Sequence, residues 1–205
     1  MGVRLCVLVS GSGTILEALL AAGVDVSLVG ADRPCRGLAV AAEAGVDSLL
    51  WDRGEYGGFR ADFDRERYSV ELARELRSRD IDLVAMAGFG TVLSGGFHEA
   101  FPGRVLNTHP SLLPDFKGWH AVPQALAAGV AQTGCTVHVA TEALDDGPIL
   151  AQRRVAVLAS DDESSLHERI KEVERALYPE VISRVMAALD DGRDVESVAR
   201  EMEEA

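Results

Sequence analysis

The first half of the chain alternates short apolar runs with stretches that carry apolar residues at helical spacing. The runs are continuous and rich in leucine or β-branched residues, as in buried strands, and cover Val3–Ser10, Val24–Ala31, Val46–Trp51, Ile81–Gly88 and Arg104–His109. In the helical stretch before the fourth run, Tyr68, Leu72 and Leu76 fall on one stripe. This alternation predicts an α/β fold with a doubly wound, mostly parallel sheet, helices on both faces and ligands at the carboxyl ends of the strands.

The pattern changes after Gln132. Residues 133–157 have the pattern of two strands joined by an acidic loop, which would extend the sheet with antiparallel strands. Residues 161–192 predict one long amphipathic helix behind Asp and Ser caps, and Pro179 is expected to bend or interrupt it. Because no stretch resembles a linker, we interpret residues 1–205 as a single domain.

The charge balance bears on the possible partners. The chain has 20 basic and 33 acidic residues and a net charge of −13, and its basic residues form no cluster, so we expect no nucleic-acid partner. The first apolar run ends in glycines after about seven residues, too few for a membrane span or a signal peptide. We therefore expect a cytoplasmic protein without a membrane partner. The sequence leaves open whether it is a monomer or a homodimer.

The glycine-rich turn Ser10–Thr14 lies between the first predicted strand and the first predicted helix. Free backbone N–H groups at a helix N-terminus suit a phosphate. A dinucleotide-binding turn would have another glycine at position 16, where this chain has Leu16, so the pattern favours a single phosphate. The alternative is that Gly11 and Gly13 only form a tight turn.

A second group of polar residues lies where the fifth run ends. Asn107 and His109 are two residues apart, so their side chains leave the same face of the predicted strand. Together they could hold one carbonyl group, with the amide as hydrogen-bond donor and the imidazole as general acid or oxyanion stabiliser. His109 could instead be a satisfied histidine near the surface. A carboxylate in the loop Ala143–Pro148, for which we favour Asp145, would orient the imidazole and favour its charged form.

Metal and serine chemistry are not indicated. The other histidines lack metal-ligand spacing, and His138, within a strand pattern, is not predicted to take part in the chemistry. The three cysteines have no C-x-x-C spacing. The turn at Ser12 also lacks the G-x-S-x-G arrangement of a serine nucleophile.

Two segments carry a resemblance to a known family. "LNTHPSLLPDFKGWHAVPQAL" and "GCTVHVATEALDDGPILAQ" resemble the formyltransferases that use 10-formyltetrahydrofolate, through the combination of N-x-H-P-S-L-L-P with D-x-G-P-I. The resemblance covers nearly the whole chain, and its size and glycine-rich first turn are most similar to the members that formylate phosphoribosylglycinamide in purine biosynthesis. It implies a Rossmann-like formyltransferase fold, extended by C-terminal antiparallel strands and a long helix.

The resemblance also implies roles for individual residues. Asn107, His109 and Asp145 would form a catalytic trio, and the Leu113-Pro114 bond would be cis. The N-terminal half would bind the nucleotide phosphate, and the C-terminal half would contribute most of the folate site. Ribonucleotide contacts would come from Gly13, Thr14, Ile15, Lys171, Glu172, Val173 and Glu174. Folate contacts would come from Arg65, Gly90, Thr91, Val92, Leu93, Asn107, Thr141, Glu142, Ala143, Leu144 and Asp145.

Several positions depart from the family pattern. Gly90 and Thr91 stand where the common form is methionine followed by a basic residue, which removes a cation from the predicted folate site. Ile15 stands where asparagine is common, a change that a phosphate contact through the backbone would tolerate.

The implied reaction is direct formyl transfer from 10-formyltetrahydrofolate to the amine of phosphoribosylglycinamide, through a tetrahedral intermediate and without a metal. A formyltetrahydrofolate hydrolase or a methionyl-tRNA formyltransferase would share the trio, but both normally carry an extra domain for which this chain has no room, and its acidity disfavours tRNA. A non-catalytic nucleotide-binding module would explain the first half of the chain, but it would give the trio no function.

Overall fold

The computed structural model describes residues 2–58 and 60–203 of the chain. It contains a seven-stranded sheet with the strand order β3-β2-β1-β4-β5-β6-β7, so the prediction of a mostly parallel sheet with helices and an antiparallel extension is confirmed. The chain divides into two compact units, one up to Leu106 and one from Asn107 onward. The interpretation as a single domain remains a prediction.

The strands of the first unit lie within the predicted apolar runs. They are β1 (Leu5–Val9), β2 (Val26–Ala31), β3 (Ser48–Leu50) and β4 (Leu83–Met86). β1 pairs in parallel with β2 and with β4, and β2 pairs in parallel with β3. All residues of β1 are buried because neighbours cover both its edges and both its faces. The carboxyl ends of β1, β2 and β4 therefore lie at one edge of the sheet.

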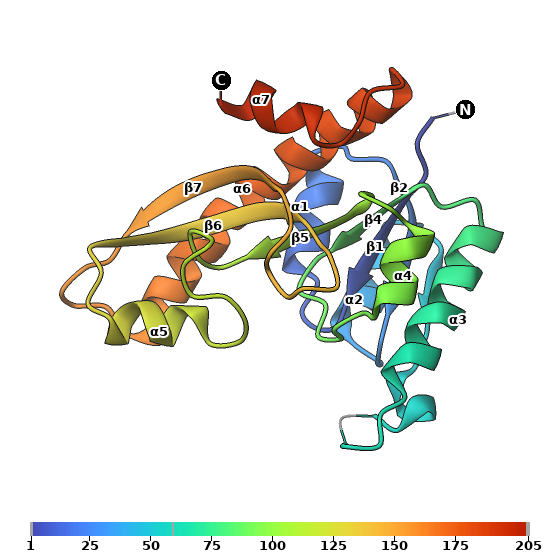
Figure 1. Ribbon diagram of the computed structural model, residues 1–205, viewed down its shortest axis with the longest axis horizontal. Coiled ribbons are helices and arrows are strands. Elements are labelled where there is room, and N and C mark those ends of the chain that lie inside the picture. Colours follow the sequence, from blue (N-terminus) through green and yellow to red (C-terminus); the bar gives the residue numbers. More distant parts are fainter. Residues whose placement is uncertain (1, 59, 204–205) are drawn as a thin grey trace. The chain divides into compact units, whose positions relative to one another are not determined.

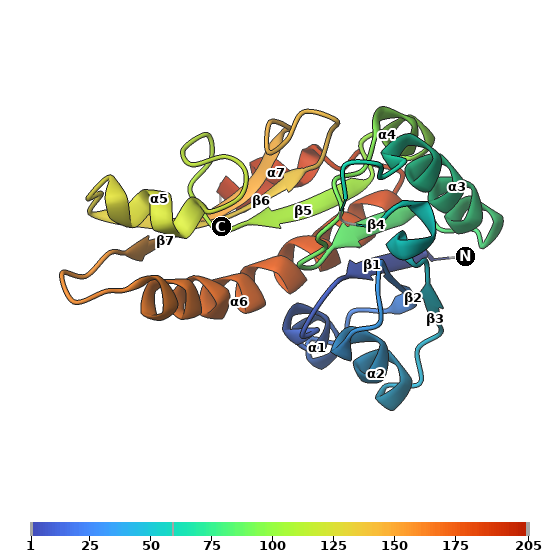
Figure 2. The ribbon, with the colours of Figure 1, turned by 90° about the horizontal axis from the view of Figure 1, so that it is seen from below.

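Helices cover both faces of these strands (Figure 2). α1 (Thr14–Ala21) and α2 (Arg36–Glu43) lie on one face, and α3 (Arg65–Ser78) and α4 (Gly95–Ala100) lie on the other. A short 3-10 helix, η1 (Arg53–Tyr56), follows β3. The predicted stripe of α3 is buried, and Asp64 caps this helix by accepting a hydrogen bond from the Arg67 N–H at 3.1 Å.

The second unit is built around a strand pair, with β6 (Gln132–Val139) antiparallel to β7 (Ile149–Ala156) (Figure 1). β5 (Val105–His109) leads into this unit. Two short helices complete it, α5 (Ala121–Ala127) and α7 (Ser197–Glu203). Gly134 permits the close pairing, because a Cβ there would lie 2.1 Å from the carbonyl oxygen of Arg153.

The long helix α6 (Glu163–Asp190) packs against β6 and β7. It starts at a capping box between Asp162 and Ser165, as the caps in the sequence predict. The helix continues through Pro179, so the expected interruption does not occur. Proline removes one backbone hydrogen bond, but Leu177, Tyr178, Val181 and Ile182 are almost fully buried on either side of it, and this packing holds both halves of the helix in place.

None of the described helices is long and apolar enough to cross a membrane.

Candidate active site

The end of β5 directs its polar side chains to opposite faces. Asn107 and His109 leave one face, and Thr108 between them leaves the other. The side chain of Thr108 contacts the Sγ atom of Cys135 at 3.1 Å and forms a hydrogen bond with Glu174 of α6. β5 therefore presents an amide and an imidazole on one side while its other side is tied to β6 and α6.

Both ring nitrogens of His109 face oxygen atoms. Nδ1 lies 3.3 Å from Oδ2 of Asp145, and Nε2 lies 2.8 Å from the carbonyl oxygen of Phe116. A carbonyl oxygen only accepts, and so does an ionised carboxylate. Both ring nitrogens therefore lie opposite atoms that accept hydrogen bonds, and one of these atoms belongs to Asp145.

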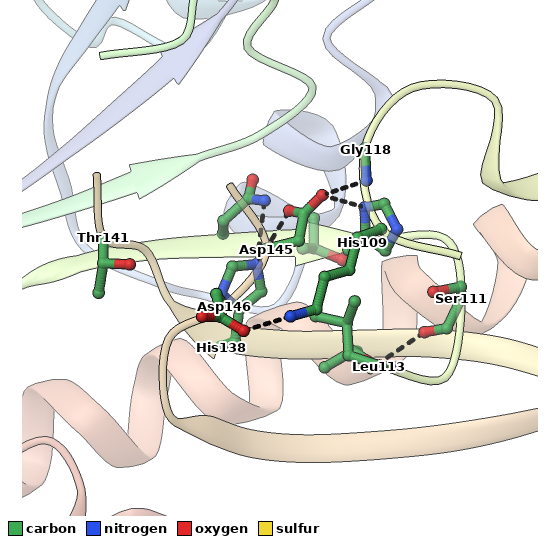
Figure 3. Close-up of polar contacts among 12 residues, drawn as sticks. His109, Ser111, Leu113, Gly118, His138, Thr141, Asp145 and Asp146 are labelled. Atoms are coloured by element: carbon green, nitrogen blue, oxygen red, sulfur yellow. Dashed lines mark hydrogen bonds and ion pairs between the residues drawn. The ribbon is translucent and has the colours of Figure 1, made fainter. Parts of the chain in front are cut away.

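Asp145 lies between two histidines (Figure 3). Its Oδ2 accepts a hydrogen bond from the Gly118 N–H at 2.8 Å, in addition to the contact with His109, and its Oδ1 lies 3.5 Å from Nε2 of His138. Burial raises the pKa of this carboxyl, but the hydrogen bonds and the neighbouring imidazoles outweigh burial and hold the pKa below its ordinary value. Asp145 is therefore a carboxylate at neutral pH, and it lies 3.3 Å from Nδ1 of His109.

The loop that carries Asp145 points this side chain inward and leaves its other side chains outside. Asp145 is buried in a left-handed conformation with φ of 52°, whereas Thr141, Glu142, Ala143 and Leu144 are exposed. Gly147 makes the turn possible, since a Cβ there would lie 1.8 Å from the carbonyl oxygen of Val139. Of the predicted folate segment 141–145, only Asp145 reaches the cluster of polar side chains formed with Asn107, His109 and His138.

The loop after β5 is fixed by side chains of the strand pair. The hydroxyl of Thr136 donates to the carbonyl of Ser111 at 2.7 Å and accepts from the N–H of Leu113 at 3.0 Å. The Gln152 side chain donates to the carbonyl of Leu113 at 2.9 Å. The Leu113-Pro114 bond is cis, as the resemblance predicts. These bonds place the segment that brings Phe116 and Gly118 to His109 and Asp145.

The site also contains His138, whose side chain the sequence does not assign to it. Its side chain is 1% exposed, its Nε2 lies 3.2 Å from Nδ2 of Asn107, and its Nδ1 lies 3.0 Å from the carbonyl oxygen of Val139. The pattern of β6 does place His138 on the same face as Thr136, two residues earlier. Nothing in the sequence says that Asp145 folds back onto that face.

On α6, only one residue of the predicted ribonucleotide segment is buried. Burial raises the pKa of the Glu174 carboxyl to about 6. Lys171 lies 3.5 Å from Glu168, and Glu172 is exposed. Glu174 is therefore set apart from Lys171, Glu172 and Val173 as the member of this segment inside the fold.

The predicted phosphate turn lies in the first unit, at the N-terminus of α1. Gly13 has a φ of 75° and precedes Thr14 and Ile15, the first residues of the helix, and no side chain caps this end. A Cβ at Gly13 would lie 2.9 Å from the Cα of Gly37. Glycine is thus required here, and the N–H groups of the first helical turn are directed out of the helix end.

The loop after β4 contains the predicted folate residues Gly90, Thr91, Val92 and Leu93. The Thr91 hydroxyl donates to Oδ2 of Asp32 at 2.8 Å and accepts from the Arg53 guanidinium at 3.1 Å. Arg33 pairs with Asp32 at 3.0 Å, and its guanidinium would lie 3.0 Å from a Cβ at Gly90. Glycine and threonine remove a cation from these two positions, but arginines from two other segments of the same unit reach them. Arg65 is exposed at the start of α3.

Among the described residues, no group of three or more His, Cys, Asp or Glu side chains is arranged to hold a metal ion.

Comparisons with known proteins identify the family to which the chain belongs. The family model described as formyl transferase matches residues 3–182. The chain belongs to the formyl transferase family. Membership of this family implies a folate-type formyl donor.

Named relatives are similar over most of their length. The chain is 45% identical over 179 residues to the phosphoribosylglycinamide formyltransferase of Mycobacterium tuberculosis strain H37Rv, covering 85% of this chain and 80% of the relative. It is 36% identical over 187 residues to the enzyme of that name from Escherichia coli K12, covering 88% and 85%. The crystal structure of glycinamide ribonucleotide transformylase 1 from Geobacillus kaustophilus matches this formyltransferase with a TM-score of 0.82 and 36% identity, over 91% of this chain and 100% of that one.

Proposed function

We propose that this formyltransferase transfers the formyl group of 10-formyltetrahydrofolate to the amine of phosphoribosylglycinamide in purine biosynthesis. The observation that carries the proposal is the buried carboxylate of Asp145 opposite Nδ1 of His109, with Asn107 two residues along the same face of β5. The names of the relatives support phosphoribosylglycinamide as the acceptor, and the family supports a folate-type formyl donor. Both are small molecules, and we propose a cytoplasmic enzyme that needs no metal.

The reaction starts when the amine nitrogen attacks the formyl carbon, and negative charge develops on the formyl oxygen. Asn107 donates an N–H to this oxygen, and the positively charged ring of His109 stabilises it. Asp145 keeps the ring charged and oriented by facing Nδ1. Because Nε2 is bound to the carbonyl of Phe116 in this structure, the substrate has to take the place of that carbonyl.

The tetrahedral intermediate then collapses. The bond between the formyl carbon and the folate nitrogen breaks, the carbonyl reforms, and a proton passes from the attacking amine to the departing nitrogen. The N–H groups and carboxylate around His109 could order a water that carries this proton. The overall exchange consumes one amine N–H and creates one N–H on tetrahydrofolate, so atoms and charge balance.

The two substrates would use residues of different segments. The backbone N–H groups of Gly13, Thr14 and Ile15 would bind the phosphate at the N-terminus of α1. Glu174, supported by the segment Lys171–Val173, would accept hydrogen bonds from the ribose hydroxyls. Arg65, the segment Gly90–Leu93, Asn107 and the loop Thr141–Asp145 would bind the folate.

A spectrophotometric assay with 10-formyltetrahydrofolate tests the proposal. Folate product should form only when phosphoribosylglycinamide is present, and His109→Ala should abolish it. Equal deformylation without the acceptor would identify a hydrolase. No turnover either with or without phosphoribosylglycinamide would refute the proposed activity.

A further inference from the structure

His138 lies deep in the cluster and is not among the groups assigned to the reaction. Its Nε2 lies closer to the Asn107 amide, at 3.2 Å, than to the Asp145 carboxylate, at 3.5 Å. The ring is almost completely buried and its other nitrogen contacts the backbone of its own strand. It is therefore placed to act on Asn107 and cannot itself be a free acid or base for solvent.

The backbone contact defines which ring nitrogen carries a proton. The carbonyl of Val139 can only accept, and it lies 3.0 Å from Nδ1, so Nδ1 is the donor. With Nδ1 as the donor, Nε2 is the nitrogen left to accept a hydrogen bond. It lies 3.2 Å from the Asn107 amide nitrogen and 3.5 Å from Oδ1 of Asp145, and the shorter contact is the hydrogen bond, with the amide as donor. A proton on Nε2 would instead be donated to Asp145.

This tautomer selects one orientation of the Asn107 side chain. With Nδ2 toward the ring, one N–H of the amide binds Nε2, and the second N–H is free for another acceptor. With the amide turned over, its oxygen would face the lone pair of Nε2 at about the same distance, and two acceptors would repel each other. The buried ring therefore disfavours the turned-over amide.

We propose that His138 is a positioning residue that locks the Asn107 amide with an N–H directed at the developing oxyanion. This inference rests on the proposed formyl transfer, in which Asn107 donates to the formyl oxygen. The Asn107 amide donates to the formyl oxygen and to Nε2 of His138, and Nδ1 of His138 donates to the Val139 carbonyl. Asp145 and, through it, His109 are the charged groups that face the same region.

A double-mutant cycle tests these contacts. His138→Leu replaces the imidazole by an apolar side chain of similar size and removes the acceptor, so kcat should fall about tenfold to a hundredfold with both KM values within about twofold. In the Asn107→Ala background the same substitution should change kcat by less than about threefold, because there is no amide left to orient. In the Asp145→Asn background its full effect should remain.

Other patterns would overturn the proposal. If the effect of His138→Leu vanished with Asp145→Asn and persisted with Asn107→Ala, the ring would act through the carboxylate. An effect that persisted in both backgrounds would make the role merely structural. His138→Gln restores an acceptor oxygen and should recover most of the kcat lost in His138→Leu; no recovery would also count against the lock.

The tautomer can be measured without turnover. Nitrogen-15 NMR of histidine-labelled protein at neutral pH should show His138 protonated at Nδ1 and unprotonated at Nε2. A proton on Nε2 would overturn the proposal even in an active enzyme. A protein that shows the expected tautomer and no transfer would contradict the proposed function while leaving the ring geometry intact.

Discussion

Nδ1 of His109 and Oδ2 of Asp145 lie 3.3 Å apart, and both side chains are almost completely buried. Asp145→Asn would keep the shape of this contact and remove the negative charge that holds the imidazolium. We expect kcat to fall by about a hundredfold or more with little change in melting temperature. Steady-state kinetics measure the change in kcat, and thermal unfolding measures the melting temperature.

Asp146 provides the matched control for Asp145→Asn. It is the next residue along the chain, but its side chain is exposed and pairs with Lys117 (Figure 3). Asp146→Asn should therefore change kcat by less than about twofold, as expected for an exposed ion pair. A similar loss of kcat in both variants would contradict the assignment of Asp145.

Glu174 makes the stability of the protein depend on pH. Its pKa is raised from the ordinary 4.5 to about 6 by burial, so the folded state prefers the protonated form. This contribution to stability is fully present below pH 4.5 and is lost as the pH rises through about 6. At pH 8, Glu174→Gln should raise the free energy of unfolding by about 2 kcal/mol relative to the native sequence, and the two should converge below pH 4.5.

Urea unfolding at pH 4.5 and pH 8 measures the effect of Glu174→Gln. Glu172→Gln, at an exposed position of the same helix, should show no such pH-dependent difference. A stability difference for Glu174→Gln that is equal at both pH values would contradict the raised pKa. The same variant should raise KM for phosphoribosylglycinamide if Glu174 binds the ribose.

Gly147 should tolerate no side chain. A Cβ at this position would lie 1.8 Å from the carbonyl oxygen of Val139, a backbone atom that cannot move aside without breaking the β6 pairing. Gly147→Ala should lower the free energy of unfolding by about 3 kcal/mol or more. At Gly11 an added methyl group would meet nothing within 4 Å, so Gly11→Ala should have a much smaller effect in the same urea titration.

Arg53 should contribute to folate affinity through Thr91. Its guanidinium lies 3.8 Å above the ring of Phe63 and donates to the Thr91 hydroxyl at 3.1 Å, which brings a positive charge to a segment that lacks one in its sequence. Arg53→Gln should raise KM for 10-formyltetrahydrofolate about fivefold, equivalent to about 1 kcal/mol, and leave KM for the ribonucleotide unchanged.

Arg60 is the control for Arg53, since its side chain is 77% exposed and pairs only at the surface with Asp62. Arg60→Gln should leave both KM values unchanged. If Arg53→Gln behaves in the same way, Thr91 and its arginine do not face the folate.

The sequence predicts the strands well because burial of a parallel sheet leaves a direct trace in continuous apolar runs. It predicts Asn107 and His109 on one face because strand geometry alternates, and the family motif adds Asp145. It misses His138, Phe116 and Gly118 for different reasons. His138 is indistinguishable from a core residue until the loop at Asp145 is placed, and the contacts of Phe116 and Gly118 use backbone atoms, which no residue type reveals.

Gly90 and Thr91 carry no cation themselves, but the Arg53 guanidinium lies 3.1 Å from the Thr91 hydroxyl. Arg53 lies 38 residues before Thr91 in the chain. The pairings of β3 with β2, of β2 with β1 and of β1 with β4, together with the turn into η1, bring the two residues together. The charge near a binding site depends on every side chain that folds next to it, whatever the position of that side chain in the sequence. A comparison of aligned positions therefore underestimates how segments distant in the sequence can substitute for one another.

The two faces of β5 have different roles. Thr108 contacts Cys135 and Glu174 on one face. Asn107 and His109 lie on the opposite face. The face of β5 on which each of these side chains lies is consequently fixed by its position along the strand. Inserting or deleting one residue just before Asn107 would deliver the hydroxyl of Thr108 to Asp145 and turn the imidazole toward Cys135, exchanging the two sides in a single step. Changes of length among descendants of this sequence should therefore fall in the loops and spare residues 105–109.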